Sequence, residues 1–478
     1  MTSNTAPSDE ARYAAWREVG LFGLARVGIG FQRDPIRALR RVNERFGPTA
    51  SFARRSHGLS VARPLVVTTD PQLLRKVLTD PRFRNSSLTL SGPRDSAHRR
   101  LRHSIFRMHG EEHRRNRRLL APAMQRTAVE GLHSSMVAVA ANTIDRYVAG
   151  ETRNVADDMK EIARQIAAAS LFGLSDLDES ERMGIMIDDW LSDSFRVMPR
   201  VFGYDLPGTA FRKMLQKAEH LEKIARELVE RKRSENYQGS DLLTHLVRAH
   251  DEGGPISEAE LLGHIHIFFL AGHETTSHAL SWTLMLLAQH PEVFKRVCAE
   301  IRKELSGTPG EVPTPESLNR LEYLDRVIAE SLRLFPIVPL GARIASEDLE
   351  IDGQPIVRKT RLVIPFSVLH HDASVFPNPE RFDPDRWLGT DPPPYSYLPF
   401  SSGLHMCIGV PFAKQSMRIT LAMLLARYSL QLVQDSRIDR RTTVTMSPKQ
   451  GVHIEVLPRD TMPRRARMSG NALDLVTF

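Results

Sequence analysis

The stretch that decides the fold is Phe400-Ser401-Ser402-Gly403-Leu404-His405-Met406-Cys407-Ile408-Gly409, which holds one of only two cysteines in a chain of 478 residues. Because glycine accepts positive φ angles and close backbone approach, we expect Gly403 and Gly409 to wrap the chain tightly around the sulfur of Cys407. The residues that follow predict a helix with Pro411 in its first turn, where proline is tolerated. A lone cysteine is most often an inert buried thiol, but a helix N-terminus with backbone donors stabilises a thiolate.

A long helical segment lies upstream, between a predicted capping box at Ser257 and Glu260 and a stop at Pro291. Residues 265–270 are apolar on nearly every face, which predicts a helix that crosses the core. Ala271-Gly272-His273-Glu274-Thr275-Thr276 then interrupts it with small and polar groups. A buried carboxylate is costly unless it is solvated or paired. The interruption is therefore either a kink whose threonines bond back to carbonyls or a polar notch that opens onto a cavity.

Two shorter motifs separate these segments. Glu330-Ser331-Leu332-Arg333 places an acid and a base one helical turn apart, and Pro379-Glu380-Arg381-Phe382 follows it. Each motif alone is weak, because an E-x-x-R pattern arises by chance in most long helical proteins. Together and in this order, the four motifs make the chain resemble the cytochrome P-450 family over residues 34–457.

The resemblance implies the cytochrome P-450 fold, a triangular helical prism with haem between a long central helix and the cysteine loop. The sequence pattern likewise predicts a mostly α chain with a minor β portion (α+β). A helix opens at Asp34-Pro35 and stops at Gly47-Pro48. Residues 59–69 predict a short hairpin, and alternating patterns return at 342–366 and 442–457.

The domain organisation follows from the reach of the resemblance and from the absence of any linker-like composition. We expect a lead-in segment at residues 1–33, a single catalytic domain at 34–457 and a basic tail at 458–478.

The resemblance also implies the cofactor, heme b, with Cys407 as the axial ligand of its iron. In this family the thiolate pushes electron density onto the iron and favours O–O cleavage. Phe400 and Gly409 would belong to the haem-binding loop, and Ala271 and Gly272 would leave room for oxygen.

By the same resemblance, Glu274 and Thr275 lie on the oxygen side and are the expected catalytic pair. Thr275 would hold a water there and Glu274 would relay protons from solvent, a form of general acid delivery. A monooxygenase that inserts one atom of O2 into its substrate is the reaction implied.

The two haem propionates would need cations. The family places an aromatic residue or histidine four positions before an arginine, which here gives His113 and Arg117. Arg343 and His405 complete the expected set, since arginine offers carboxylates a fork of donors.

Glu330, Arg333 and Arg381 are expected to form a buried structural network that locks the loop before the cysteine. The expected substrate pocket is apolar, which favours a hydrophobic small molecule. Its residues would be Ile105, Phe106, Ile267, Leu270, Ala271 and Val338. Residues 175–240, the expected lid, carry no signature that identifies a substrate, but a role in bacterial secondary metabolism fits the bacterial type of the resemblance.

Electrons must come from separate proteins, because no flavin or iron–sulfur module is fused to this chain. The resemblance implies a ferredoxin or flavodoxin with its reductase, fed ultimately by NAD(P)H. An arginine-rich segment at residues 94–126 would dock this partner, and the formal net charge of +8 is concentrated there.

The composition also limits which partners and which cellular compartment we expect for the protein. No nucleic-acid motif accompanies the basic segment, so we expect no nucleic-acid partner. Two cysteines exclude a disulfide framework and fit a reducing cytosol. The acidic N-terminus is no signal peptide, and the apolar stretch at 19–31 is too short to span a membrane. We expect a cytoplasmic monomer without a transmembrane anchor.

Two alternative functions compete with the monooxygenase. Haem-thiolate proteins also isomerise or dehydrate oxygenated substrates, or merely bind haem, but they tend to lack the acid–threonine pair. His109-Gly110-Glu111-Glu112-His113 matches an inverted zinc-protease motif, which makes a zinc hydrolase using His109 and His113 a remote alternative. The arginines that follow at once are a poor setting for a divalent cation.

Overall fold

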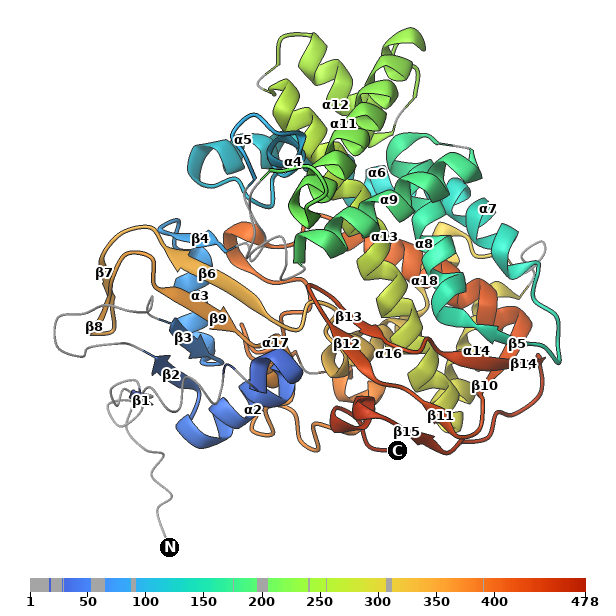
Figure 1. Ribbon diagram of the computed structural model, residues 1–478. Coiled ribbons are helices and arrows are strands. Elements are labelled where there is room, and N and C mark those ends of the chain that lie inside the picture. The colour runs from blue at the N-terminus through green and yellow to red at the C-terminus, as the bar shows by residue number, and fades with distance from the viewer. Residues whose placement is uncertain are drawn as a thin grey trace, which may run out of the picture. The chain divides into compact units, whose positions relative to one another are not determined.

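The computed structural model describes residues 17–18, 28, 30–52, 65–86, 92–174, 176–195, 205–239, 241–254, 256–306, 312–389 and 391–478. The chain divides into two compact units, one made of residues 1–87, 339–376 and 392–406 and the other of residues 88–338, 377–391 and 407–478. The strands are short and the helices contain most of the regular structure, as the sequence predicts (Figure 1).

The first unit is built around a six-stranded sheet with the order β1-β2-β3-β9-β6-β4. Its strands are β1 (Arg17–Glu18), β2 (Thr49–Phe52), β3 (Leu65–Thr68), β9 (Arg361–Ile364), β6 (Gly341–Ala345) and β4 (Phe83–Asn85). The pairs β1–β2 and β3–β9 are parallel and the other three are antiparallel. The unit also holds α2 (Pro35–Phe46), α3 (Pro71–Thr79), α17 (Phe366–Leu369) and a small hairpin of β7 (Leu349–Ile351) and β8 (Gln354–Ile356).

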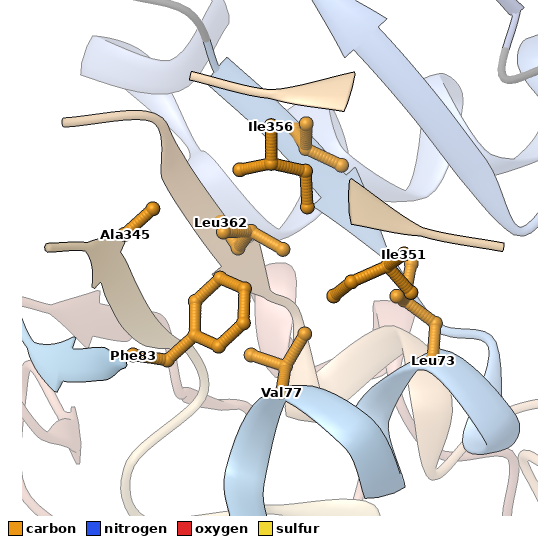
Figure 2. Packing of buried hydrophobic residues seen from close by; sticks show 8 residues of the cluster. Leu73, Val77, Phe83, Ala345, Ile351, Ile356 and Leu362 are labelled. Atoms are coloured by element: carbon orange, nitrogen blue, oxygen red, sulfur yellow. The ribbon is translucent and has the colours of Figure 1, made fainter. Parts of the chain in front are cut away.

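One face of this sheet packs on α3, as Figure 2 shows. Leu73 and Val77 stand one turn apart on the helix, so both point to the same face. They pack with Phe83 of β4 and Leu362 of β9, and all four side chains are almost completely buried. Burying each such side chain contributes about 1.5–3 kcal/mol, so the helix and the sheet hold each other in place.

In the first unit, the predicted bounds of one helix are confirmed, whereas the predicted hairpin is only partly right. Asp34 caps α2 by accepting from the backbone N–H groups of Ile36 and Arg37, and the helix ends at Phe46, as predicted. The predicted hairpin at 59–69 is only partly right, because β3 pairs with β2, which begins at Thr49. Residues 53–64 lie outside the described residues.

The second unit is built mainly of helices (Figure 1). They are α4 (Ala97–Leu101), α5 (Gly110–Leu120), α6 (Arg126–Glu130), α7 (His133–Ile144), α8 (Val155–Phe172), α9 (Leu177–Phe195), α11 (Ala210–Ser234), α12 (Leu242–Asp251), α13 (Glu258–Gln289), α14 (Pro291–Leu305), α15 (Pro315–Asn319), α16 (Glu322–Leu334) and α18 (Val410–Arg427). Of these, α13 is the element against which α4, α8, α16 and α18 all pack.

The capping box that the sequence predicts begins α13. The Ser257 hydroxyl accepts from the N–H of Glu260, and the Glu260 carboxylate accepts from the N–H of Ser257. Buried residues lie on every face of the following turns, so the helix crosses the core of its unit. Trp282 stacks on Phe335 with ring centroids 4.4 Å apart and donates to the carbonyl of Met446 at 2.9 Å.

The second unit also contains short strands. They are β5 (Thr152–Asn154), β10 (Tyr428–Leu432), β11 (Ser436–Arg437), β12 (Arg440–Thr442), β13 (Met446–Pro448), β14 (His453–Pro458) and β15 (Met468–Ser469). The alternating pattern at 442–457 covers β13 and part of β14, but these strands pair with β12 and with β10 and β5, not with each other. Within the described part of the chain, no helix is both long and apolar enough to cross a bilayer.

Candidate functional site

The cysteine loop of the second unit begins at Cys407 and leads directly into α18. Gly409 is the N-cap of that helix, and its proline lies in the first turn, as predicted. Burial raises the pKa of the Cys407 thiol, whereas a hydrogen bond from the Gly409 backbone and the positive charge of Arg117 lower it. The residue is nevertheless accessible to solvent.

The two glycines of the loop act differently. Gly403 has a φ of +70°, and a Cβ at this position would lie 2.1 Å from the carbonyl oxygen of Leu78, so only glycine fits. Gly409 has a φ of −87°, and a Cβ there would be 3.9 Å from the sulfur of Cys407, an ordinary contact. The expectation of special backbone geometry is confirmed for Gly403 and is wrong for Gly409, whose role is to present its N–H to the sulfur.

The interrupted turn of α13 lies against the start of α18. A Cβ on Gly272 would be 3.3 Å from Leu171 of α8 and 3.9 Å from Phe412, which follows Cys407 by five residues. Gly272 therefore permits close packing of α13 against α8 and α18. Ala271 is exposed although most residues on either side of it in α13 are buried, which fits the predicted opening onto a cavity.

The expected catalytic pair occupies this turn. The carboxylate of Glu274 accepts a hydrogen bond from the Thr445 hydroxyl at 3.0 Å. Burial raises the pKa of Glu274, the Thr445 bond opposes this, and the negative charge of Asp188 adds to the rise. The hydroxyl of Thr275 donates to the Ala271 carbonyl at 2.7 Å, so its oxygen presents lone pairs as an acceptor.

A second carboxylate, that of Asp188, acts electrostatically on Glu274. Asp188 of α9 lies 2.6 Å from the ammonium of Lys160 and 3.4 Å from the Nε2 atom of His273. Burial alone would raise the pKa of Asp188, but His273 and Lys160 lower it to about 2. Sequence reasoning missed Asp188, Lys160 and Thr445, because they reach α13 from distant parts of the chain.

Two of the expected propionate contacts lie on α5. His113 is buried, and burial together with the nearby charge of Arg117 lowers its pKa. Arg117 acts on Cys407 as well, which places this helix beside the thiol.

The other three expected haem contacts belong to the first unit. Arg343 of β6 is buried, burial lowers its pKa to about 10, and no carboxylate among the described residues of its own unit pairs with it. Phe400 is half-buried, and His405 ends a short 3-10 turn, η5 (Gly403–His405). A buried cation without an acidic partner fits an anionic ligand such as a carboxylate.

Two members of the predicted network, Glu330 and Arg333, form an ion pair and are completely buried. The carboxylate of Glu330 receives two hydrogen bonds of 2.8 Å from the Arg333 guanidinium. It also accepts from the backbone of Asp383 at 3.1 Å, from Arg386 at 3.2 Å and from the indole of Trp387 at 3.0 Å.

The expectation for Arg381 is wrong in one respect. Arg381 is exposed, and it contributes its carbonyl oxygen, which accepts from Arg333 at 3.1 Å. The second guanidinium on Glu330 belongs to Arg386, from η4 (Pro384–Trp387). The Arg-Trp pair directly after the third motif was the signal that would have found it.

The predicted pocket residues of α13 fall on one side of that helix. Ile267, Ala271 and Thr275 are spaced by four and are all at least partly exposed, while Leu270 is almost buried. Phe106 is 52% exposed. The remaining two are Ile105, which is buried, and Val338, which is half-buried.

The arginines of the segment at residues 94–126 differ in their exposure and in their ion-pair partners. Arg100 forms an ion pair with Glu222 at 2.7 Å, and Arg115 pairs with the buried Glu260. Arg114 and Arg118 remain largely exposed on α5, where each forms an ion pair with the exposed Glu111. These two offer positive charge to a partner.

The zinc alternative finds no support in the geometry. Among the described residues, no three histidine, cysteine or acidic side chains gather in a way that could hold a metal ion. His109 caps α5, and His113 lies one turn inside it, buried.

These surroundings fit a haem group. Within the second unit, the exposed Cys407 stands at a helix start, a turn of α13 packs beside that helix, and His113 and Arg117 lie on α5. Cys407 would bind the iron, while His113 and Arg117 would serve the propionates.

Comparisons with known proteins agree with this geometry. The family model described as Cytochrome P450 matches residues 20–455. A cyclooctat-9-en-7-ol 5-monooxygenase of Streptomyces melanosporofaciens is 32% identical over 372 residues, which cover 76% of this chain and 79% of that protein. Cytochrome P450 4c3 of Drosophila melanogaster is 37% identical over 225 residues, covering 45% of this chain and 41% of that one.

A solved structure shows the same fold. The retinoic acid-bound cyanobacterial CYP120A1 matches with a TM-score of 0.76 and 23% identity, covering 88% of this chain and 93% of that one. The predicted fold class is thereby confirmed. The chain belongs to the cytochrome P450 family of haem-thiolate monooxygenases.

Proposed function

We propose that this protein inserts one oxygen atom from O2 into a hydrophobic small molecule of bacterial secondary metabolism. The observation that carries the proposal is the packing of the Gly272 turn of α13 against Phe412 of α18. That contact brings Glu274 and Thr275 to the helix that begins behind Cys407.

Haem bound at Cys407 would supply the activation of dioxygen. The protein's part is to hold the sulfur. The Gly409 N–H and the charge of Arg117 both favour the thiolate form, and a helix N-terminus adds its positive dipole.

Proton handling would fall to Glu274. Burial raises its pKa, which favours the protonated carboxyl, and the Thr445 hydrogen bond fixes its orientation. Thr275 offers an oxygen acceptor one residue further along the helix, which suits it to holding a water in the open turn.

We propose that electrons pass from NAD(P)H through a reductase and a ferredoxin or flavodoxin. The exposed Arg114 and Arg118 of α5 support this, because helix α5 also carries the arginine that acts on Cys407. An acidic partner docked there would lie near the thiol. We place the protein in the cytoplasm as a monomer, with residues 34–457 as one catalytic domain.

The substrate would be apolar over most of its surface. Ile267, Leu270, Ala271, Phe106 and Val338 offer an apolar lining. The Streptomyces relative is named for an alcohol, cyclooctat-9-en-7-ol, which supports a hydrophobic alcohol as one class of substrate.

The test is turnover in dioxygen labelled with oxygen-18. Haem-loaded protein, a ferredoxin, its reductase and NADPH would be incubated with terpenoid alcohols and fatty acids that shift the haem spectrum on binding. One labelled oxygen in the product is the expected result. A product formed without label would instead show an isomerase or dehydratase.

A further inference from the structure

A completely buried histidine of α13 joins two other parts of the second unit. His264 lies one turn before Ile267 and two turns before Ala271, so it belongs to the side of α13 that carries the expected pocket residues. Its Nε2 atom is 2.8 Å from the side-chain oxygen of Asn116 on α5. Its Nδ1 atom is 3.4 Å from the backbone nitrogen of Ile105. The histidine therefore contacts both α5 and the segment that follows α4.

The hydrogen bonds of this junction allow one arrangement of protons. The Glu260 carboxylate and the Glu112 carbonyl only accept, so the Asn116 amide turns its NH2 group to them, at 2.9 Å and 3.0 Å. The side-chain oxygen of Asn116 then faces His264, which must donate from Nε2. Nδ1 of His264 is left as the acceptor for the backbone N–H of Ile105.

The burial of His264 supports this arrangement. Burial lowers the pKa of His264 to about 4, so the ring is neutral at neutral pH and keeps an acceptor nitrogen. Both ring nitrogens then have a hydrogen-bond partner. Because a buried polar group that loses its partner costs about 1–3 kcal/mol, the junction favours one position of the backbone at Ile105.

The segment after α4 is held to the same two helices at two further points. A Cβ on Gly263 would lie 2.0 Å from the carbonyl oxygen of His103, so only glycine lets this backbone lie so close to α13. The His103 ring lies 2.7 Å from the side-chain oxygen of Glu112 on α5. Phe106, which follows the anchored Ile105, is 52% exposed. The backbone of the segment is thus fixed while the Phe106 ring stays accessible.

We propose that Asn116 and His264 are positioning residues that set how far residues 102–109 close over the substrate pocket, and so select ligands by size. Ile105 and Phe106 of this segment belong to the expected lining of that pocket. Asn116 directly precedes Arg117, so the junction also ties the segment to the helix of the expected propionate contacts. The inference rests on the proposed function and adds residues that determine its specificity.

The experiment uses azoles of graded size, whose ring nitrogen binds the haem iron directly. Imidazole, 4-phenylimidazole and clotrimazole would be titrated into haem-loaded wild type and into His264→Leu, following the haem spectrum. Releasing the segment should raise the affinity for clotrimazole relative to 4-phenylimidazole at least fivefold. The affinity for imidazole, which is smaller than either, should stay unchanged.

Two further variants separate positioning from general stability. His264→Gln still offers a donor and an acceptor, so it should restore the wild-type ratio of affinities. His245→Leu is the matched control and should leave all three affinities unchanged, because the exposed His245 of α12 lies 3.3 Å from the Leu119 carbonyl near the end of α5. If His264→Leu keeps the wild-type ratio, or if all three affinities change together, the proposal is overturned.

Amide hydrogen exchange on the wild type tests the same claim without a variant. Peptides that cover residues 102–109 should stay protected with 4-phenylimidazole bound. They should exchange at least tenfold faster with clotrimazole bound, because the larger ligand needs the segment open, and equal exchange in the two complexes would refute the proposal. Since azole binding needs no turnover, size selection without oxygen insertion would contradict the proposed function and not this inference.

Discussion

Replacing Arg333 with alanine should destabilise this protein more than almost any other single change outside the site. Arg333 and Glu330 are both 0% exposed and share two hydrogen bonds of 2.8 Å. Without the Arg333 guanidinium, Glu330 keeps its hydrogen bonds from Asp383, Arg386 and Trp387. Only one of the two guanidinium groups that balance its negative charge then remains. Removing one member of a buried ion pair costs about 3–5 kcal/mol.

That loss is large beside a typical total stability of about 5–15 kcal/mol. The carbonyl oxygens of Pro379 and Arg381 also lose their donor in the variant. We therefore expect a marked fall in the urea midpoint and in haem retention, measured by circular dichroism and by haem absorbance at equal protein concentration.

A matched control comes from an ion pair that joins α18 to the same helix, α16. Arg418 pairs with Asp325 of α16, and both side chains are partly exposed, so Arg418→Ala should cost only about 0–1 kcal/mol. A double variant, Glu330→Leu with Arg333→Met, should recover part of the single-variant loss, because no buried charge remains. If Arg333→Ala is no less stable than Arg418→Ala, the network does not hold the fold as argued.

Three further changes test the account. Gly403→Ala should lower stability by at least about 1–2 kcal/mol in thermal unfolding, because its φ is positive and its Cβ would meet Leu78; an unchanged midpoint contradicts this. Burial would raise the pKa of Glu260, but its hydrogen bonds lower it from 4.5 to about 2. The free energy of unfolding of the wild type should therefore exceed that of Glu260→Gln most at neutral pH, and this difference should shrink as the pH falls below about 5. A difference that stays constant with pH would refute the prediction. Thr445→Val removes a hydrogen bond that lowers the pKa of Glu274, so the alkaline limb of the pH–rate profile for turnover should move to higher pH. An unchanged pH–rate profile would count against Glu274 as the proton donor.

Local signals predicted the parts of this fold that local chemistry decides. The Asp34 cap fixed the start of α2, and the Ser257–Glu260 box fixed the start of α13, because each signal acts within three or four residues. The helices predicted to carry Glu274 and to follow Cys407 are both present, as α13 and α18.

Predictions failed where the deciding contact is distant in sequence. Strand β3 takes its parallel partner from β9, almost 300 residues away, so no hairpin pattern could give its register. A motif also names a residue without saying which of its atoms is used, and Arg381 proved to act through its carbonyl. The bond between His98 and Trp190 joins elements 92 residues apart and left no trace in the sequence pattern.

The central claim is that the sulfur of residue 407 binds the haem iron. The carbon monoxide difference spectrum of the reduced protein tests it most directly, with wild type and Cys407→Ala reconstituted side by side with hemin. We expect the thiolate-type band in wild type and its complete loss in the variant, while Cys298→Ala keeps it, because Cys298 is a buried thiol whose pKa burial raises to about 12. An identical spectrum in Cys407→Ala, or a wild-type protein that refuses hemin, would contradict the account.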